Sequence, residues 1–144
     1  MASHQQKGPK LFSVQEANQL LPEVQEILKD LRKRRSAVLK LDEKKAVEEL
    51  SWLREDGSVS PKAKSEVDRL DKRMEEEAGA FEEGLERLGE IGAQLKDLDE
   101  GLVDFFTARG ETLVCLCWKE GEDRIRHWHD LESGFTGRRP LEQL

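Results

Sequence analysis

The sequence predicts an α+β fold that is mainly α. We expect a long antiparallel helical hairpin with a short N-terminal helix, followed by a small three-stranded antiparallel β-meander at the C-terminus. Apolar residues recur at three- and four-residue steps as far as residue 92, which is the period of amphipathic helices. After residue 93 the period becomes strand-like, and short glycine-bearing turns separate the apolar runs.

Length and composition predict one domain. The chain has 144 residues, enough to bury a real core, and its charged fraction of 38% is typical of long solvated helices. Residues 1–10 are polar and contain Gly8-Pro9, so we expect a disordered N-terminal tail. The remaining residues, 11–144, are expected to form a single domain, with a helical part over 11–92 and the β-meander and tail over 93–144.

The first predicted element is a short helix over residues 13–21. Ser13 is a favourable N-cap, and Glu16 lies three residues later, which is the spacing of a capping box. Pro22 lacks an amide hydrogen, and its ring clashes with the preceding turn. We therefore expect the helix to kink or restart at Pro22.

Two long helices follow and are predicted to pair. The first extends from about residue 22 to residue 54, and the second ends between Gly89 and Leu95. A short turn over residues 55–61 joins them, so they should form an antiparallel hairpin of coiled-coil type.

Opposite charges support this pairing. Residues 29–45 hold eight basic and three acidic residues, whereas residues 66–100 hold thirteen acidic and five basic ones. Folding about the turn would bring Lys45 near Asp71 and the basic run Arg32–Arg35 near Glu82. The basic run is therefore interpreted as the partner of the acidic helix rather than as a nucleic-acid patch.

The β-meander is predicted from three apolar runs, residues 102–106, 113–119 and 124–131. Short loops containing Gly110 and Gly121 join them, which favours antiparallel pairing of neighbours. The middle run is apolar on both faces, so it should be the central strand and be covered on both sides.

Cys115, Cys117, His127 and His129 form the most conspicuous candidate metal site, because two thiols and two imidazoles are a ligand set of tetrahedral zinc. Strand register decides whether they meet. Pairing Lys119 with Arg124 across the loop would set the cysteines opposite residues 126 and 128, with the histidines on the other sheet face. We therefore favour no metal site, predict no cofactor, and interpret both cysteines as small buried thiols.

Other polar side chains near the C-terminus suggest a ligand or anion site. His129 has several acids near it in sequence, and a histidine held by a carboxylate such as Asp104 can act as a base or a metal ligand. Arg138 can hold an anion in its guanidinium fork, or, as we favour, it can pair with one of the chain's own Asp or Glu side chains, such as Asp99 or Asp104. Trp118 is interpreted as core unless it is exposed. The sequence contains neither a nucleophile elbow nor a phosphate-binding glycine loop, so no catalytic residue is assigned.

Several motifs together resemble a known family. They are Phe12-Ser13-x-x-Glu16-Ala17-Asn18, Leu95-Lys96-Asp97-Leu98, Gly101-Leu102-Val103-Asp104-Phe105, Leu116-Cys117-Trp118-Lys119, Trp128-His129 and Gly134-Phe135-x-Gly137-Arg138. In this order they resemble a bacterial family known as domain of unknown function 2203, over about residues 11–141. The resemblance implies a small cytoplasmic protein with a helical hairpin and a β element, and it implies no activity.

The resemblance also ranks the candidate residues. Family-like segments share the Trp-His pair and the glycine-arginine tail, and they do not depend on Cys115 or His127. This leaves the candidate ligand or anion site as Asp97, Asp104, Trp118, His129 and Arg138.

Three functions remain open at this point, and we favour the first. The first is a structural or protein-interaction module, either a homo-oligomer or bound to a protein partner through the hairpin. The second is a small-ligand or metal-binding site, possibly hydrolytic, around His129 and Asp104. The third is nucleic-acid binding through Arg32–Arg35, which the net charge of −7 argues against.

Location in the cell is predicted from what the sequence lacks. It contains no apolar run near the roughly 20 residues of a membrane span and no signal-peptide pattern at its start. The two cysteines are spaced too closely for a disulfide framework, which suits a reducing compartment. We expect a cytoplasmic protein that does not bind membranes.

Overall fold

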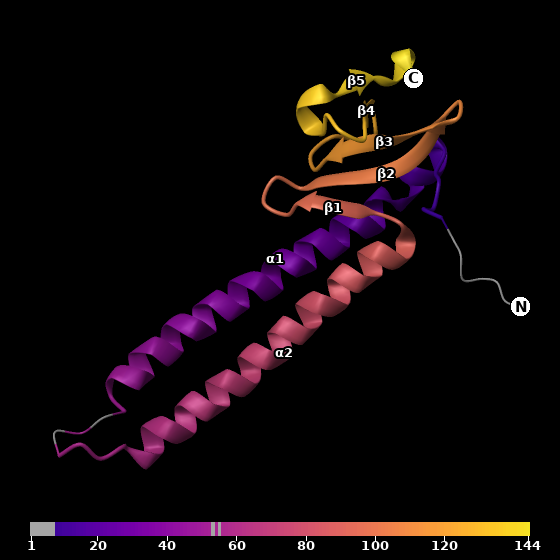
Figure 1. Cartoon of the computed structure of the whole chain (residues 1–144). Coiled ribbons are helices and arrows are strands. Elements are labelled where there is room, and N and C mark those ends of the chain that lie inside the picture. The colour runs from indigo at the N-terminus through magenta and orange to yellow at the C-terminus, as the bar shows by residue number, and fades with distance from the viewer. Residues whose placement is uncertain (1–7, 53, 55) are drawn as a thin grey trace, which may run out of the picture. The chain divides into compact units, whose positions relative to one another are not determined.

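The computed structural model describes residues 8–52, 54 and 56–144. Within them the chain forms two long helices and then a five-stranded antiparallel sheet (Figure 1). One compact unit joins the described residues up to Leu28 with Arg87–Leu144, and the other is Lys29–Glu86. Most of the tail predicted to be disordered, residues 1–7, lies outside the described residues, and the single domain over residues 11–144 stays a prediction.

The first helix, α1 (Val14–Leu50), starts at the predicted capping box. The Glu16 amide donates to Ser13 Oγ at 3.0 Å, and the Ser13 amide donates to Glu16 Oε1 at 2.8 Å. These two bonds satisfy amide hydrogens that have no partner inside the helix.

The separate short N-terminal helix was a wrong prediction, because α1 continues through Pro22. Pro22 is exposed, whereas Ala17, Leu21 and Val24 around it are buried. A proline inside a helix costs about 3 kcal/mol, and each fully buried leucine or valine contributes about 1.5–3 kcal/mol. Burial of the opposite helix face therefore outweighs the proline.

The second helix, α2 (Pro61–Ile91), ends within the predicted interval. In the unit Lys29–Glu86 it pairs with α1 as an antiparallel helical hairpin. The predicted contact between Lys45 and Asp71 is confirmed at 2.8 Å. Arg34 forms its interhelical ion pair with Glu77 at 3.0 Å, so one member of the basic run is engaged inside the hairpin.

The sheet has more strands than the sequence predicted. Its strands, in spatial order, are β1 (Gln94–Asp97), β2 (Leu102–Arg109), β3 (Thr112–Lys119), β4 (His127–Asp130) and β5 (Arg139–Pro140). The three predicted strands correspond to β2, β3 and β4. The prediction missed β1, which is short and irregular between Leu95 and Asp97, and β5, which has only two residues.

The register predicted between β3 and β4 was wrong by one residue. Cys115 lies opposite His129, and Cys117 lies opposite His127. The loop is longer than predicted because the Lys119 amide donates to Glu122 Oε1 at 2.8 Å, which holds a turn there and delays β4 until His127. The cysteines and histidines therefore share one face of the sheet.

The opposite face of the sheet packs against Phe12 and the first turns of α1 (Figure 1). The Phe12 ring meets the Phe105 ring edge-on at 5.3 Å between centroids, and Asn18 Oδ1 accepts a hydrogen bond from the Ile125 amide at 2.7 Å. The central strand β3 is buried on both faces from Val114 to Trp118, as predicted. Neither described helix carries an apolar stretch able to cross a membrane.

Candidate functional site

The candidate site is on the face of the sheet turned away from α1, on the three adjacent strands β2, β3 and β4. Strand parity and register bring Asp104 opposite Cys117, and Cys115 opposite His129. All four residues are almost fully buried, with whole-residue exposures between 1% and 3%. Burial of a carboxylate and an imidazole costs free energy unless they have partners. Each of their polar atoms therefore needs a hydrogen bond or a bound ion.

His129 contacts an oxygen atom at each ring nitrogen. Its Nδ1 lies 2.7 Å from the Asp130 carbonyl oxygen, and its Nε2 lies 3.0 Å from Asp104 Oδ2. Both oxygens are acceptors, so the tautomer decides which contact is a hydrogen bond, and a hydrogen on Nδ1 would be donated to the Asp130 carbonyl. In that neutral tautomer Nε2 presents a lone pair to the Asp104 carboxylate, and the contact is favourable only when a cation, either a proton or a metal ion, lies between the two atoms.

Cys117 completes a compact group with these two residues. The carboxylate of Asp104, the thiol of Cys117 and a ring nitrogen of His129 lie within 4.8 Å of one another. Burial, and next the charge of Asp104, raises the pKa of Cys117 to about 12, and the same two causes raise the pKa of Cys115 to about 11. Both thiols are therefore protonated near neutral pH and are poor nucleophiles as they stand.

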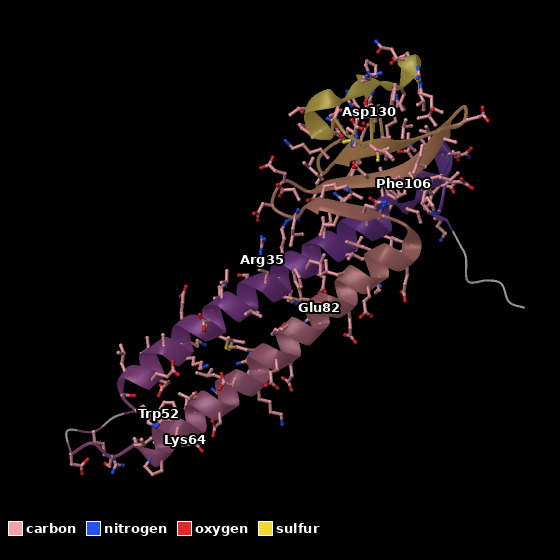
Figure 2. The ribbon with its side chains drawn as sticks, viewed as in Figure 1. Arg35, Trp52, Lys64, Glu82, Phe106 and Asp130 are labelled. Carbon is pink, nitrogen blue, oxygen red and sulfur yellow. The ribbon has the colours of Figure 1, made fainter. Side chains whose placement is uncertain are left out.

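A pocket of about 300 Å³ opens onto this group. Its walls combine apolar side chains with a few polar ones: Gln94, Lys96, Leu102, Phe106, Leu131, Glu132 and Phe135, together with Gly134. Phe106 on β2 and Asp130 on β4 mark this part of the sheet in Figure 2. The volume is at the lower end for small-molecule sites, which are mostly apolar with a few convergent polar groups.

Arg138 lies beside the pocket and pairs with one of the chain's own acidic side chains, as expected, and that side chain is Glu122. Its Nη2 donates to the two carboxylate oxygens of Glu122 at 2.7 and 2.9 Å. Its guanidinium also lies 4.7 Å from the centre of the Phe135 ring. Arg138 thus ties the pocket wall at Phe135 to the β3–β4 loop.

The other predicted site residues lie elsewhere. Trp118 is on the α1-facing side of the sheet, 1% exposed, and its Nε1 donates to the Glu122 carbonyl. Asp97 is exposed and accepts a hydrogen bond from the Glu100 amide in the β1–β2 turn. His127 shares the cysteine face, with its Nδ1 3.9 Å from Glu122 Oε2. The structure thus brings together only Asp104 and His129 of the candidate set.

Several residues at the site escaped sequence analysis. Cys117 was set aside through the wrong register, and Glu122 was interpreted only as part of a turn. Gln94 and Lys96 belong to a strand that was not predicted. One sequence pattern could have identified part of this face. Asp104 and Phe106 are alternate residues of one predicted strand, and alternate residues line the same face of a sheet.

Comparison with known proteins supports the predicted family. No curated protein and no solved structure matches the chain. The family described as "Uncharacterized conserved protein (DUF2203)" matches residues 10–141, which is nearly the whole chain. The chain therefore belongs to the DUF2203 family.

Proposed function

We propose that this protein binds a small molecule in the pocket on the open face of the sheet, with Asp104 and His129 as its polar floor. One observation carries the proposal, the 3.0 Å contact between Asp104 Oδ2 and His129 Nε2 at the base of a pocket. Both side chains are only 4% exposed, and burying ionisable groups costs stability even when they are paired, so the pair favours a functional role. Buried ionisable pairs that line a cavity are typical of binding and catalytic sites.

The pocket walls indicate the kind of ligand. Phe106, Leu131 and Phe135 offer apolar surface, while the floor offers a hydrogen-bonding pair. A ligand with a small apolar body and one polar group at its inner end satisfies both. Binding is favoured over nucleophilic catalysis because the raised pKa values of the two thiols keep them protonated.

The test is a screen of small aromatic and aliphatic acids, amines and alcohols by two-dimensional NMR of the labelled protein. We expect binders to shift the amide signals of Asp104, Cys117 and His129 together. Leu131→Trp should weaken binding by about tenfold or more, because the larger ring fills the pocket mouth. Tenfold weaker binding corresponds to a loss of about 1.4 kcal/mol of binding free energy. Leu144→Trp is the matched control, because Leu144 is also partly exposed but does not line the pocket.

The outcome that contradicts the proposal is equally specific. A screen in which ligands shift signals of the hairpin but not those of the three strands would place binding elsewhere. Equal binding by the Leu131 and Leu144 variants would also reject this pocket.

A second function, self-association through the hairpin, has its own supporting observation. A pocket of about 260 Å³ in the unit Lys29–Glu86 is lined by Arg35, Val38, Leu39, Ala78, Phe81 and Glu82. Leu39 is 59% exposed, which is high for a leucine beside other apolar side chains. We propose that a second copy of this chain covers the patch.

Charge argues for a copy of the chain as the occupant. The patch has a basic wall on α1, at Arg35, and an acidic wall on α2, at Glu82, which Figure 2 labels on the two helices. Two hairpins lying side by side in the same direction would set each α1 against the other α2. Opposite charges would then face each other across a two-fold axis.

A further inference from the structure

We infer that a zinc ion binds at the floor of the sheet pocket, held by the carboxylate of Asp104, the thiolate of Cys117 and Nε2 of His129. This inference rests on the proposed function, because it supplies the floor of the same pocket with an ion that a small ligand can contact. It concerns the ion alone, however, so it can be tested without any organic ligand.

The spacing of the ligand atoms suits zinc. Zinc lies about 2.0–2.2 Å from nitrogen and oxygen ligands and about 2.3 Å from sulfur, in tetrahedral geometry, so N and O ligands are about 3.3 Å apart and N and S ligands about 3.6 Å apart. His129 Nε2 and Asp104 Oδ2 are 3.0 Å apart, and the ligand atoms of all three residues lie within 4.8 Å of one another. Binding of the ion would draw these atoms together to the ligand spacing of zinc.

The histidine is already oriented as a metal ligand. In the tautomer with hydrogen on Nδ1, the Asp130 carbonyl oxygen, 2.7 Å from Nδ1, accepts that hydrogen, and the Nε2 lone pair is directed at Asp104. Metal-bound histidines usually donate their second ring hydrogen to a carbonyl or carboxylate in this way. The proton that otherwise lies between Nε2 and Oδ2 is then replaced by the ion.

Charge and ligand chemistry select the metal. One carboxylate and one thiolate neutralise a divalent ion, and on binding the thiol proton and the proton between His129 and Asp104 pass to solvent. Thiolate and imidazole ligands favour zinc over magnesium or calcium, which prefer oxygen. Two positive side chains lie near the ion position: Lys96 lines the pocket, and Arg138 is paired with Glu122, which offsets its charge.

Three protein ligands leave a fourth position, which faces the pocket. Zinc sites with an open position hold water or a substrate there, whereas structural sites have four protein ligands. A small molecule with an anionic or thiol group at its inner end is the class of ligand that would occupy this position.

The experiment uses the full-length protein, purified under reducing conditions and stripped of metal, with cobalt(II) as the spectroscopic probe. We expect one equivalent of cobalt to produce the near-ultraviolet charge-transfer band of a thiolate ligand, and one equivalent of zinc to remove it. Cys117→Ser should abolish that band and weaken zinc binding by more than about tenfold, since even changes beyond the first ligands cost 10–100-fold. Thr107→Ser is the matched control: Thr107 is buried on the neighbouring strand β2, does not line the pocket, and its variant should keep the band.

Each result decides one point. Absence of a cobalt–thiolate band in the wild-type protein, or its equal loss in both serine variants, overturns the zinc site. Circular dichroism shows that each variant is folded before its spectrum is used. If cobalt binds as expected but no small molecule shifts the pocket signals, the ligand pocket fails and the ion site stands; the reverse pattern rejects only the ion.

Discussion

Glu122 is the residue with the most varied contacts near the candidate site. Its carboxylate accepts hydrogen bonds from Arg138 and from the Lys119 amide, and its carbonyl accepts one from Trp118 Nε1. These bonds join the β3–β4 loop to the core on one side and to the pocket wall on the other. Charge-assisted bonds of this kind contribute about 1.5–3 kcal/mol when partly buried.

The first prediction at this scale concerns acid. Burial raises the pKa of Glu122, but the Arg138 hydrogen bond and the Lys119 amide more than offset it, so its pKa is lowered from 4.5. A carboxyl group whose pKa is lower in the folded than in the unfolded state stabilises the fold at pH values above its unfolded-state pKa. It loses that contribution as the pH falls. We expect the free energy of unfolding to decline as the pH falls below 4.5, which is the ordinary pKa of a glutamate side chain.

Glu122→Gln tests this prediction in urea unfolding. The variant should be about 1–3 kcal/mol less stable at neutral pH and should lose less stability than the wild type on acidification. Glu142→Gln, at an exposed glutamate near the C-terminus, should match the wild type at both pH values. An acid response in Glu122→Gln as steep as that of the wild type would contradict the assignment.

At the same scale, sequence analysis found part of the candidate site. Asp104 and His129 were selected because a histidine near carboxylates is chemically suggestive, and the structure brings them into contact. Cys117 was rejected because the residue at which β4 begins decides whether Cys117 and His129 share a face of the sheet. That position is fixed by a hydrogen bond from a backbone amide to the Glu122 side chain, which no alternation of apolar residues reveals.

Among the elements, α2 offers a matched pair of glycines. A Cβ atom at Gly79 would meet nothing within 4 Å, and its φ is not positive. Gly92, just after α2, has a φ of 90°, and a Cβ there would lie 2.6 Å from Phe12 Cζ. The same substitution should therefore have opposite effects at the two positions.

We predict that Gly79→Ala raises the free energy of unfolding by about 1 kcal/mol, the difference in helix propensity between the two residues. Gly92→Ala should lower it by about 1 kcal/mol or more, because a left-handed backbone and the Phe12 ring both resist a side chain. Urea unfolding followed by circular dichroism measures both. Stabilisation by Gly92→Ala would show that α2 ends differently from the structure.

The elements also show where sequence analysis succeeds. The capping box at Ser13 and the end of α2 depend on neighbouring residues, and both were predicted. Pro22 was misinterpreted because a local penalty was weighed without the buried face of α1 that outweighs it. The two edge strands were missed because β1 is interrupted by a register shift and β5 is too short to show alternation.

For the whole molecule, the hairpin patch predicts a dimer. Light scattering of the wild-type protein at tens of micromolar should give twice the mass of the chain. Leu39→Glu should give a monomer, because it buries a charge at the centre of the patch, while the fold tolerates it at a position 59% exposed. Leu11→Glu, at a leucine 51% exposed and outside the hairpin, should remain dimeric. A monomeric wild type would end this proposal.

The hydrogen bond from the Ile125 amide to Asn18 has a consequence for how the chain is made. The two residues are 107 positions apart, so the ribosome must complete most of the protein before the start of α1 meets the sheet. At about 5–20 residues per second, that interval lasts about 5–20 s. For most of it, until the first strands at residues 94–109 are made, Ala17, Leu21 and Val24 have no strand to cover them. The nascent chain thus carries an uncovered apolar helix face during translation, and cotranslational chaperones have that time to bind it.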